Sequence, residues 1–232
     1  GMSYSAKKPV VDRMLEALPG TLMLAGTALV FTLLYALPAG IISALNRNKW
    51  VDYLLRAASF VGVSMPTFWL GLVLIYIFGL KLGLVPIATS RVTPIGVILP
   101  AATLAVVVGS KYMRQVRLVI LEEMEKDYVI GARARGVSEM KILFGHILPN
   151  AVLPLITILG VVMGWLLGGV AVVEMVFSWP GLGNMAIYAI TMRDYPLIEG
   201  FVLWVALAYM CINALIDASY ILLDPRLKRE RA

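Results

Sequence analysis

The sequence predicts an all-α membrane protein with five transmembrane helices, and three observations support this fold class. Hydrophobic residues make up 60% of the 232 residues and charged residues only 15%, whereas soluble domains carry about 25% charged residues. Mean hydropathy is +0.87. Long windows without charge recur along the chain, and a helix needs about 20 apolar residues to cross the hydrocarbon layer. Soluble, disordered and collagen-like classes are therefore excluded.

Five windows are free of Asp, Glu, Lys and Arg, and each predicts one span. The first four are long enough by themselves, and the fifth needs a few flanking residues to reach the required length. The predicted spans cover about 17–46, 57–80, 92–110, 147–173 and 197–218, within a single domain of residues 1–232.

The distribution of basic residues predicts the orientation. With five spans, alternate loops lie on the same side, which gives fourteen Lys and Arg on one side and six on the other. The positive-inside rule places the fourteen in the cytoplasm, so the N-terminal residues face outward. A basic N-terminus that faces outward normally follows a signal or a span, so we expect a further helix upstream of this chain. The alternative is a protein that starts at Met2 after an added glycine.

Residues 111–146 form the longest polar stretch, and its pattern is helical. Apolar residues at helical spacing predict that the third span continues into the cytoplasm. Residues 127–135 predict a short helix that Gly136 ends as a left-handed cap, and Ser138 is placed to cap a second helix over 139–146. The residues alone favour equally an anchor to anionic lipid and a docking surface for a soluble partner.

One run of residues, with a pair that follows it, is recognisable: Asp127-Tyr128-Val129-Ile130-Gly131-Ala132-Arg133-Ala134-Arg135-Gly136 and Leu148-Pro149. This pattern resembles the EAA loop of ABC importer permeases. Ala132 matches the second alanine of that motif and Gly136 its glycine, whereas Ile130, Gly131 and His146 depart from it. The basic form of the loop is similar to that of the dipeptide, oligopeptide and nickel branch.

Further motifs that are similar to this branch follow in the same order along the chain. They are Pro9-Val10 with Leu18-Pro19-Gly20-Thr21-Leu22, Ser64-Met65-Pro66-Thr67-Phe68-Trp69, Phe177-Ser178-Trp179-Pro180-Gly181-Leu182-Gly183, Arg193-Asp194-Tyr195-Pro196 and Asp224-Pro225-Arg226.

The resemblance implies a type I ABC importer permease-like helical bundle with a cytoplasmic coupling helix in the loop 111–146. It implies a second homologous permease subunit, two ATP-binding subunits, an extracytoplasmic substrate-binding protein and membrane lipid as partners, in a bacterial or archaeal inner membrane, and no nucleic acid. The ATPase-coupling residues would be Asp127, Tyr128, Ala132, Arg133, Arg135, Gly136, Leu148 and Pro149. Arg133 and Arg135 would pair with acidic groups on the ATPase, and Tyr128 and Ala132 would pack into its groove.

The chain carries no catalytic signature of its own. A Walker A loop, an H-E-x-x-H motif and a G-x-S-x-G motif are all absent from the sequence. One histidine, His146, and one cysteine, Cys211, do not make a multi-ligand metal site. We therefore expect a permease subunit that is not an enzyme, without cofactor or metal, with ATP and Mg bound on the partner ATPase subunits.

Three other features are candidates for function. Residues 175–193 contain Pro180, Gly181 and Gly183 and predict an external re-entrant or interfacial segment whose irregular backbone is buried in protein. The alternative is an ordinary external loop that Trp179 and Tyr188 anchor.

Acids at or near the ends of apolar segments and glycines within one of them are the other two candidates. The acids are functional candidates or plain structural acids, and they are Glu174, Glu199 and Asp217. Glycines at small-xxx-small spacing permit close packing, either between subunits or within the chain, and they are Gly160, Gly164, Gly168 and Gly169.

Together these features predict the pathway subunit of an ATP-driven, binding-protein-dependent importer of short peptides or nickel chelates, coupled to its ATPase through the loop 127–149. The alternative class is a secondary transporter driven by an ion gradient. Such a transporter would be expected to carry buried acids in the middle of its spans, whereas the five windows here are free of charge.

Overall fold

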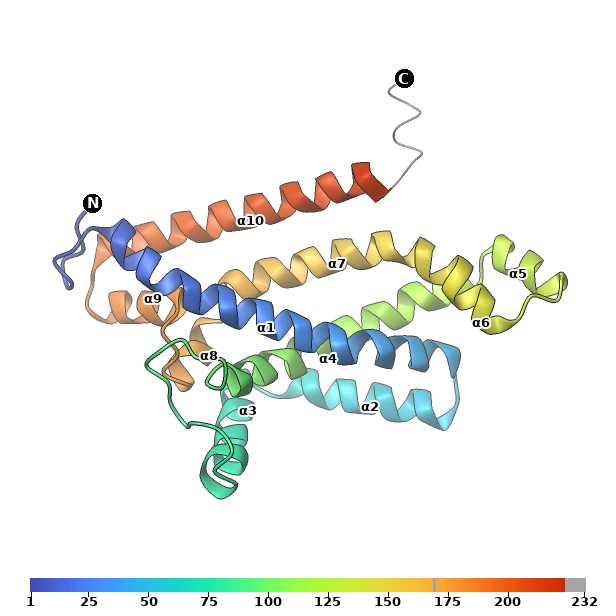
Figure 1. The fold of residues 1–232 in the computed structure, drawn as a ribbon, viewed down its shortest axis with the longest axis horizontal. Coiled ribbons are helices and arrows are strands. Elements are labelled where there is room, and N and C mark those ends of the chain that lie inside the picture. The colour runs from blue at the N-terminus through green and yellow to red at the C-terminus, as the bar shows by residue number, and fades with distance from the viewer. Residues whose placement is uncertain (169, 224–232) are drawn as a thin grey trace.

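The computed structural model describes residues 1–168 and 170–223, which form an elongated helical bundle (Figure 1). Five long helices run roughly along its long axis: α1 (Val10–Leu45), α2 (Trp50–Ser64), α4 (Ile98–Met124), α7 (Leu148–Gly168) and α10 (Tyr195–Leu223). The short elements are α3 (Thr67–Leu74), the π-helix η1 (Ile75–Lys81), α5 (Asp127–Ala134), α6 (Glu139–Ile142), the π-helix η2 (Leu143–Ile147), α8 (Ala171–Val176) and α9 (Leu182–Thr191). The Asp224-Pro225-Arg226 motif and the basic tail lie outside the described residues.

Three helices among the described residues are long and apolar enough to cross a membrane. They cover residues 10–45, 139–167 and 195–219. A fourth span results if α2 and the helix over 67–81 are counted together, although the two are bent by 101°. Residues 57–80 therefore do not form one straight helix, because Met65 precedes Pro66 and takes the extended conformation that a following proline favours.

The third predicted span lies in α4, which begins at Ile98 instead of residue 92. The same helix continues to Met124, as the apolar spacing predicts, and carries charged residues from Lys111 onward. Five crossings of the membrane stay a prediction for the segments 57–80 and 92–110.

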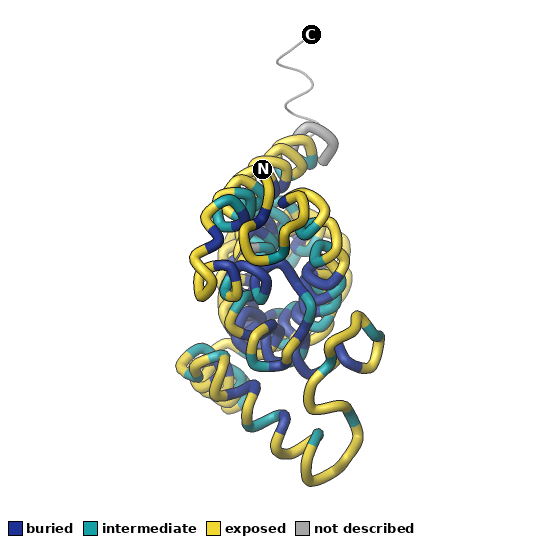
Figure 2. Tube along the Cα trace, turned by 90° about the vertical axis from the view of Figure 1, so that its left-hand side faces the viewer, coloured by how far each residue is buried: buried dark blue, intermediate teal, exposed yellow. Residues whose placement is uncertain are grey.

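The core lies where α1 packs along α4. Small residues allow the two helices to approach closely: a side chain at Gly40 would meet Val116, and one at Gly109 would meet the ring of Tyr35. The Tyr35 hydroxyl donates to the backbone oxygens of Ala105 and Val106, at 3.1 and 3.0 Å. In the view along the bundle, buried residues gather in the middle and exposed ones at the periphery (Figure 2).

The glycine stripe of α7 packs within the chain. A Cβ atom at Gly160 would lie 1.8 Å from Ile216 Cδ1, and one at Gly164 would lie 2.7 Å from Tyr209 Cδ2. Both partners belong to α10. For these two glycines the structure selects intramolecular packing; the surroundings of Gly168 and Gly169 lie outside the description.

The two sets of loops lie at opposite ends of the bundle (Figure 1). The turn between α1 and α2, the α5–α6 segment and the end of α10 share one end. The N-terminus, the loop after η1 and α9 share the other. An ion pair between Arg47 Nη1 and Glu125 Oε1, 2.5 Å apart, joins two loops of the first set directly. This separation is the one that the distribution of basic residues predicts.

Candidate coupling surface and its supports

The helix α5 and the corner after it form a knob that projects beyond the ends of the long helices (Figure 1). Val129 and Ala132 are buried, at 0% and 1% exposure, and belong to the same apolar cluster as Ile120 of α4 and Ile142 of α6. The helix ends as predicted, since Gly136 has φ +77°. The amide of Gly136 donates to Arg133 O at 2.9 Å and that of Val137 to Ala132 O at 3.2 Å, which satisfies the last carbonyls of the helix.

Side chains fasten the knob to its neighbours. The Arg133 guanidinium donates to both oxygens of Glu139, at 2.8 and 3.1 Å, and thus ties α5 to α6. The Tyr128 hydroxyl donates to Glu123 Oε2 at 2.5 Å, and Lys126 pairs with the same carboxylate. Burial and the contact with Glu123 raise the pKa of Tyr128 to about 12, so its phenol stays a donor at physiological pH. The knob is therefore held rigidly on α4.

Two of the eight predicted coupling residues already make contacts within the chain. Ala132 is 1% exposed, so little of its side chain is left for an ATPase groove, and its role there stays a prediction. The Arg133 guanidinium, 35% exposed, donates to Glu139 and to the backbone oxygen of Met124, the latter at 3.3 Å. The periodicity of an eight-residue helix does not show which face packs on the bundle, and this is why the sequence did not separate the two faces.

Five of the exposed residues of this segment form what we call the knob tip: Asp127, Tyr128, Ile130, Arg135 and Met140. Ile130 is 55% exposed and Met140 61% exposed. Sequence reasoning treated Ile130 only as a departure from the EAA motif and overlooked Met140. Two exposed apolar side chains and an exposed arginine in one short segment give the tip the composition of a protein-docking surface.

Leu148 and Pro149 lie at the joint between the knob and α7. The helix is continuous from Glu139 to Leu167, and η2 ends at Ile147, two residues before Pro149. Proline has no N–H to donate to the previous turn, and a wider π-turn accommodates such a local loss without ending the helix. Ser138 occupies the N-cap position, but its side chain makes no capping hydrogen bond. One continuous helix therefore joins the knob to α7.

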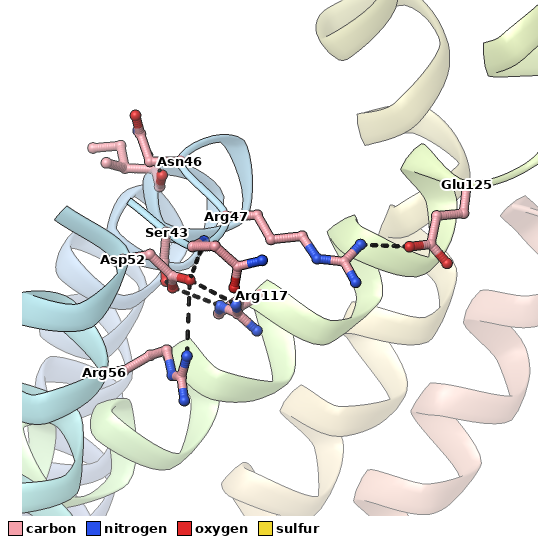
Figure 3. Close-up of polar contacts among 9 residues, drawn as sticks. Ser43, Asn46, Arg47, Asp52, Arg56, Arg117 and Glu125 are labelled. Carbon is pink, nitrogen blue, oxygen red and sulfur yellow. Dashed lines mark hydrogen bonds and ion pairs between the residues drawn. The ribbon is translucent and has the colours of Figure 1, made fainter. Parts of the chain in front are cut away.

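A buried carboxylate connects the start of α2 to α4 (Figure 3). Asp52 is fully buried. It accepts two hydrogen bonds from Arg117, Nε to Oδ1 and Nη2 to Oδ2, both 2.8 Å. The Ser43 hydroxyl donates at 2.6 Å and the Asn48 amide at 3.0 Å, and Arg56 Nη1 lies 3.9 Å away. Sequence reasoning missed this cluster; its one available signal was an acid within a basic loop.

The segment between α8 and α9 is locked to α1 at the opposite end. Glu174 is fully buried and accepts from the Thr21 hydroxyl at 2.8 Å and the Asn184 amide at 2.9 Å. Trp179 Nε1 donates to Gly20 O at 2.9 Å, and the Leu182 amide donates to Thr21 Oγ1 at 2.8 Å.

These contacts bear on the two alternatives for residues 175–193. Trp179 is fully buried, which does not suit an interfacial anchor, whereas Tyr188 is 49% exposed. Residues 181–183, around the irregular turn, are buried in protein. The position of this segment relative to the membrane stays a prediction. Glu174 fits the structural-acid alternative, while Glu199 and Asp217 are exposed.

Replacing Gly20 by alanine is expected to loosen this segment. The new Cβ would lie 2.1 Å from Pro180 O, a backbone atom that cannot rotate away, and such overpacking costs about 1–3 kcal/mol. Gly26→Ala in the same helix is the matched control, because no atom lies within 4 Å of its Cβ position; it gains about 0.5–1 kcal/mol of helix stability. Thermal unfolding of the two purified variants checks this, and equal melting temperatures would contradict the assigned contact.

Asp194, between α9 and α10, holds the N-terminal segment. Its Oδ2 accepts from the Ser3 hydroxyl at 2.5 Å, the Ser5 hydroxyl at 2.7 Å and the Ser5 amide at 3.0 Å. Burial raises the pKa of this carboxyl, but the hydrogen bonds from Ser3 and Ser5 outweigh burial and hold the pKa below its usual range. The sequence motif around residue 194 gave no sign of this contact.

Asp194→Ala is expected to free residues 3–5. Because the folded pKa is lowered, the stabilisation is fully present above the unfolded pKa of about 3.9 and is lost as pH falls further. The variant should therefore differ from the parent protein across the neutral range, with the Ser5 amide exchanging its hydrogen roughly tenfold faster or more, since hydrogen bonds to charged groups contribute about 1.5–3 kcal/mol. Hydrogen–deuterium exchange at pH 7 measures the effect. Unchanged exchange at Ser5 would refute the contact.

A bundle of long apolar helices with a knob that projects from one end is the architecture of a membrane transport subunit. The chain belongs to the family of binding-protein-dependent transport system inner membrane components, whose model matches residues 36–229.

Relatives and solved structures agree with this assignment. The chain is 37% identical over 228 residues to the glutathione transport system permease protein GsiC of Escherichia coli (strain K12), which covers 98% of this chain and 74% of that protein. The protein of the same name from Shigella boydii serotype 4 (strain Sb227) is 36% identical over the same shares.

Among solved structures, an inward-facing MetNI methionine ABC transporter matches with TM-score 0.71 and 19% identity over 90% of this chain and 97% of that one. An amino acid ABC transporter with histidines matches with TM-score 0.65 and 18% identity, over 90% and 92%. At these identities the likeness is one of fold, and it confirms the ABC importer permease-like bundle. The protein is thus an inner-membrane permease component of ATP-driven, binding-protein-dependent import.

Proposed function

We propose that this chain forms the pathway of an importer of short peptides and is coupled to two ATP-binding subunits through the knob and the joint at residues 148–149. The observation that carries the substrate class is the 37% identity to GsiC, a glutathione permease, because glutathione is itself a tripeptide. The basic form of the coupling loop, typical of the peptide and nickel branch, supports the same class.

ATP hydrolysis is coupled to transport because the knob is attached rigidly to the bundle. The knob tip docks on an ATP-binding subunit, and the Arg133–Glu139 and Tyr128–Glu123 contacts keep the knob from bending under load. The continuous helix from Glu139 to Leu167 then carries the displacement into the membrane. ATP and Mg act on the partner subunits, a second homologous permease completes the pathway, and an extracytoplasmic binding protein delivers substrate to the end where α8 and α9 lie.

The buried acids of the described residues support ATP as the energy source. Asp52, Glu123, Glu174 and Asp194 all lie at or near helix ends, and each is held by hydrogen bonds or an ion pair. A transporter driven by an ion gradient would need such groups near the membrane centre, free to take up and release the ion.

Uptake into proteoliposomes tests the proposal. The complete complex is reconstituted with its binding protein, and radiolabelled glutathione, a mixed tripeptide and a nickel chelate are compared. Tripeptide uptake that needs both ATP and the binding protein is the expected result. Uptake of the nickel chelate alone would overturn the substrate class, and uptake driven by an ion gradient without ATP would overturn the coupling.

A further inference from the structure

A cavity of about 620 Å³ lies between α2 and α4, at the same end of the bundle as the knob. Three arginines line it, Arg56, Arg114 and Arg117, together with the aromatic rings of Tyr53 and Phe60. Its volume falls within the range of about 300–1,000 Å³ typical of ligand sites. None of the residues of the knob tip or of the joint at 148–149 lines this cavity.

The arginines of this cavity exceed the negative charge beside them. Asp52 is the carboxylate that faces the site; it takes both hydrogen bonds of Arg117, and Arg56 approaches it at 3.9 Å (Figure 3). The ion pairs found among residues 1–168 and 170–223 leave Arg114 without a carboxylate. Three cations against one anion give a local excess of two positive charges.

The cations are also positioned in advance. The bidentate pair with Asp52 fixes the Arg117 side chain, which is only 14% exposed, and the Arg56 guanidinium lies 5.6 Å from the centre of the Tyr53 ring. A guanidinium binds phosphate oxygens with two parallel N–H donors. Arginines that are already ordered lose less side-chain entropy when they bind such a group.

The remaining wall indicates what the phosphate belongs to. Phe60 and Val61 continue from Arg56 toward the apolar part of α2, and Leu118 lines the wall beside Arg117 on α4. A soluble anion gains nothing from contact with this apolar wall, whereas the acyl chain of a lipid would bury apolar surface against it. Basic pockets between membrane helices on the cytoplasmic side bind acidic lipid headgroups.

We propose that this cavity binds the headgroup phosphate of an acidic phospholipid, with an acyl chain along Phe60 and Val61. The lipid then bridges α2 and α4 beside the Arg47–Glu125 ion pair and the coupling knob.

Native mass spectrometry of the complete complex tests the site. The complex is released from nanodiscs that contain phosphatidylglycerol and phosphatidylethanolamine, and bound lipid is counted. The test variant is Arg56→Gln/Arg114→Gln, which leaves the Asp52–Arg117 pair intact. The matched control is Lys49→Gln/Lys111→Gln, which removes two exposed cations from the same end without touching the cavity lining.

We expect the apparent affinity of the test variant for phosphatidylglycerol to be roughly 25-fold lower than that of the parent protein, since the variant loses two basic residues and each is worth about a factor of five. The control variant should retain it like the parent protein. Equal retention by the test variant and the parent would overturn the proposal, as happens if another subunit covers the cavity. Displacement of the lipid from the parent protein by inorganic phosphate alone would overturn the lipid as the source of the phosphate.

Discussion

Replacing Asp52 by alanine is expected to lower the free energy of unfolding by on the order of 3 kcal/mol, because the substitution leaves a largely buried guanidinium without its partner. Arg117 makes both of its short contacts, 2.8 Å each, to this carboxylate. The Ser43 hydroxyl and the Asn48 amide lose the same acceptor. The loss therefore falls on the joint between α1, α2 and α4.

Two further variants separate the buried pair from surface charge. Arg56→Gln should cost less than about 1 kcal/mol, because this side chain is 48% exposed and its nitrogen lies 3.9 Å from the carboxylate. Asp52→Ala/Arg117→Met should recover much of the loss, since it removes the unpaired charge together with its partner. Thermal unfolding of the purified complex ranks the variants. A double variant as unstable as Asp52→Ala would contradict this account.

Gly136→Val is expected to abolish transport while ATP hydrolysis continues. A φ of +77° suits glycine, and a β-branched residue pays at least about 1–2 kcal/mol there. The backbone strain at residue 136 is relieved at the lowest cost in free energy when the corner between α5 and α6 unwinds. Unwinding breaks the hydrogen bonds from residues 136 and 137 to the end of α5. When the ATP-binding subunit moves, the knob then deforms and α7 stays in place.

The control for this prediction is Gly83→Val, which imposes similar backbone strain, with φ +61°, in a loop at the opposite end. Both variants are reconstituted, and ATP hydrolysis and substrate uptake are measured together. Gly83→Val should keep the two activities in the ratio of the parent complex. Normal substrate-stimulated hydrolysis with normal uptake in Gly136→Val would refute the role of the corner.

The sequence predicted the features that local chemistry determines. The left-handed cap at Gly136, the continuation of the third span past Lys111 and the separation of basic and less basic loops all follow from residue types at short spacing. The fold class follows from composition. Each of these agrees with the structure.

The features that the sequence missed depend on contacts between distant residues. Asp52 and Arg117 are 65 positions apart, and Asp194 meets Ser3 and Ser5 across nearly the whole chain. The burial of Ala132 and the Arg133–Glu139 pair depend on how α5 packs on α4 and α6, which an eight-residue pattern does not encode. The bend at Pro66 had a local signal, but hydropathy windows measure apolar length and not direction.

Cross-linking from the knob tip tests the central claim most directly, because that claim is physical contact between this surface and an ATP-binding subunit. A single cysteine is introduced by Ile130→Cys in a Cys211→Ser background and, for comparison, by Met192→Cys, which is 51% exposed at the opposite end of the bundle. The account predicts a cross-link from residue 130 to the ATP-binding subunit whose yield changes when ATP is added, and none from residue 192. No cross-link from residue 130, or an equal yield from both positions, would contradict it.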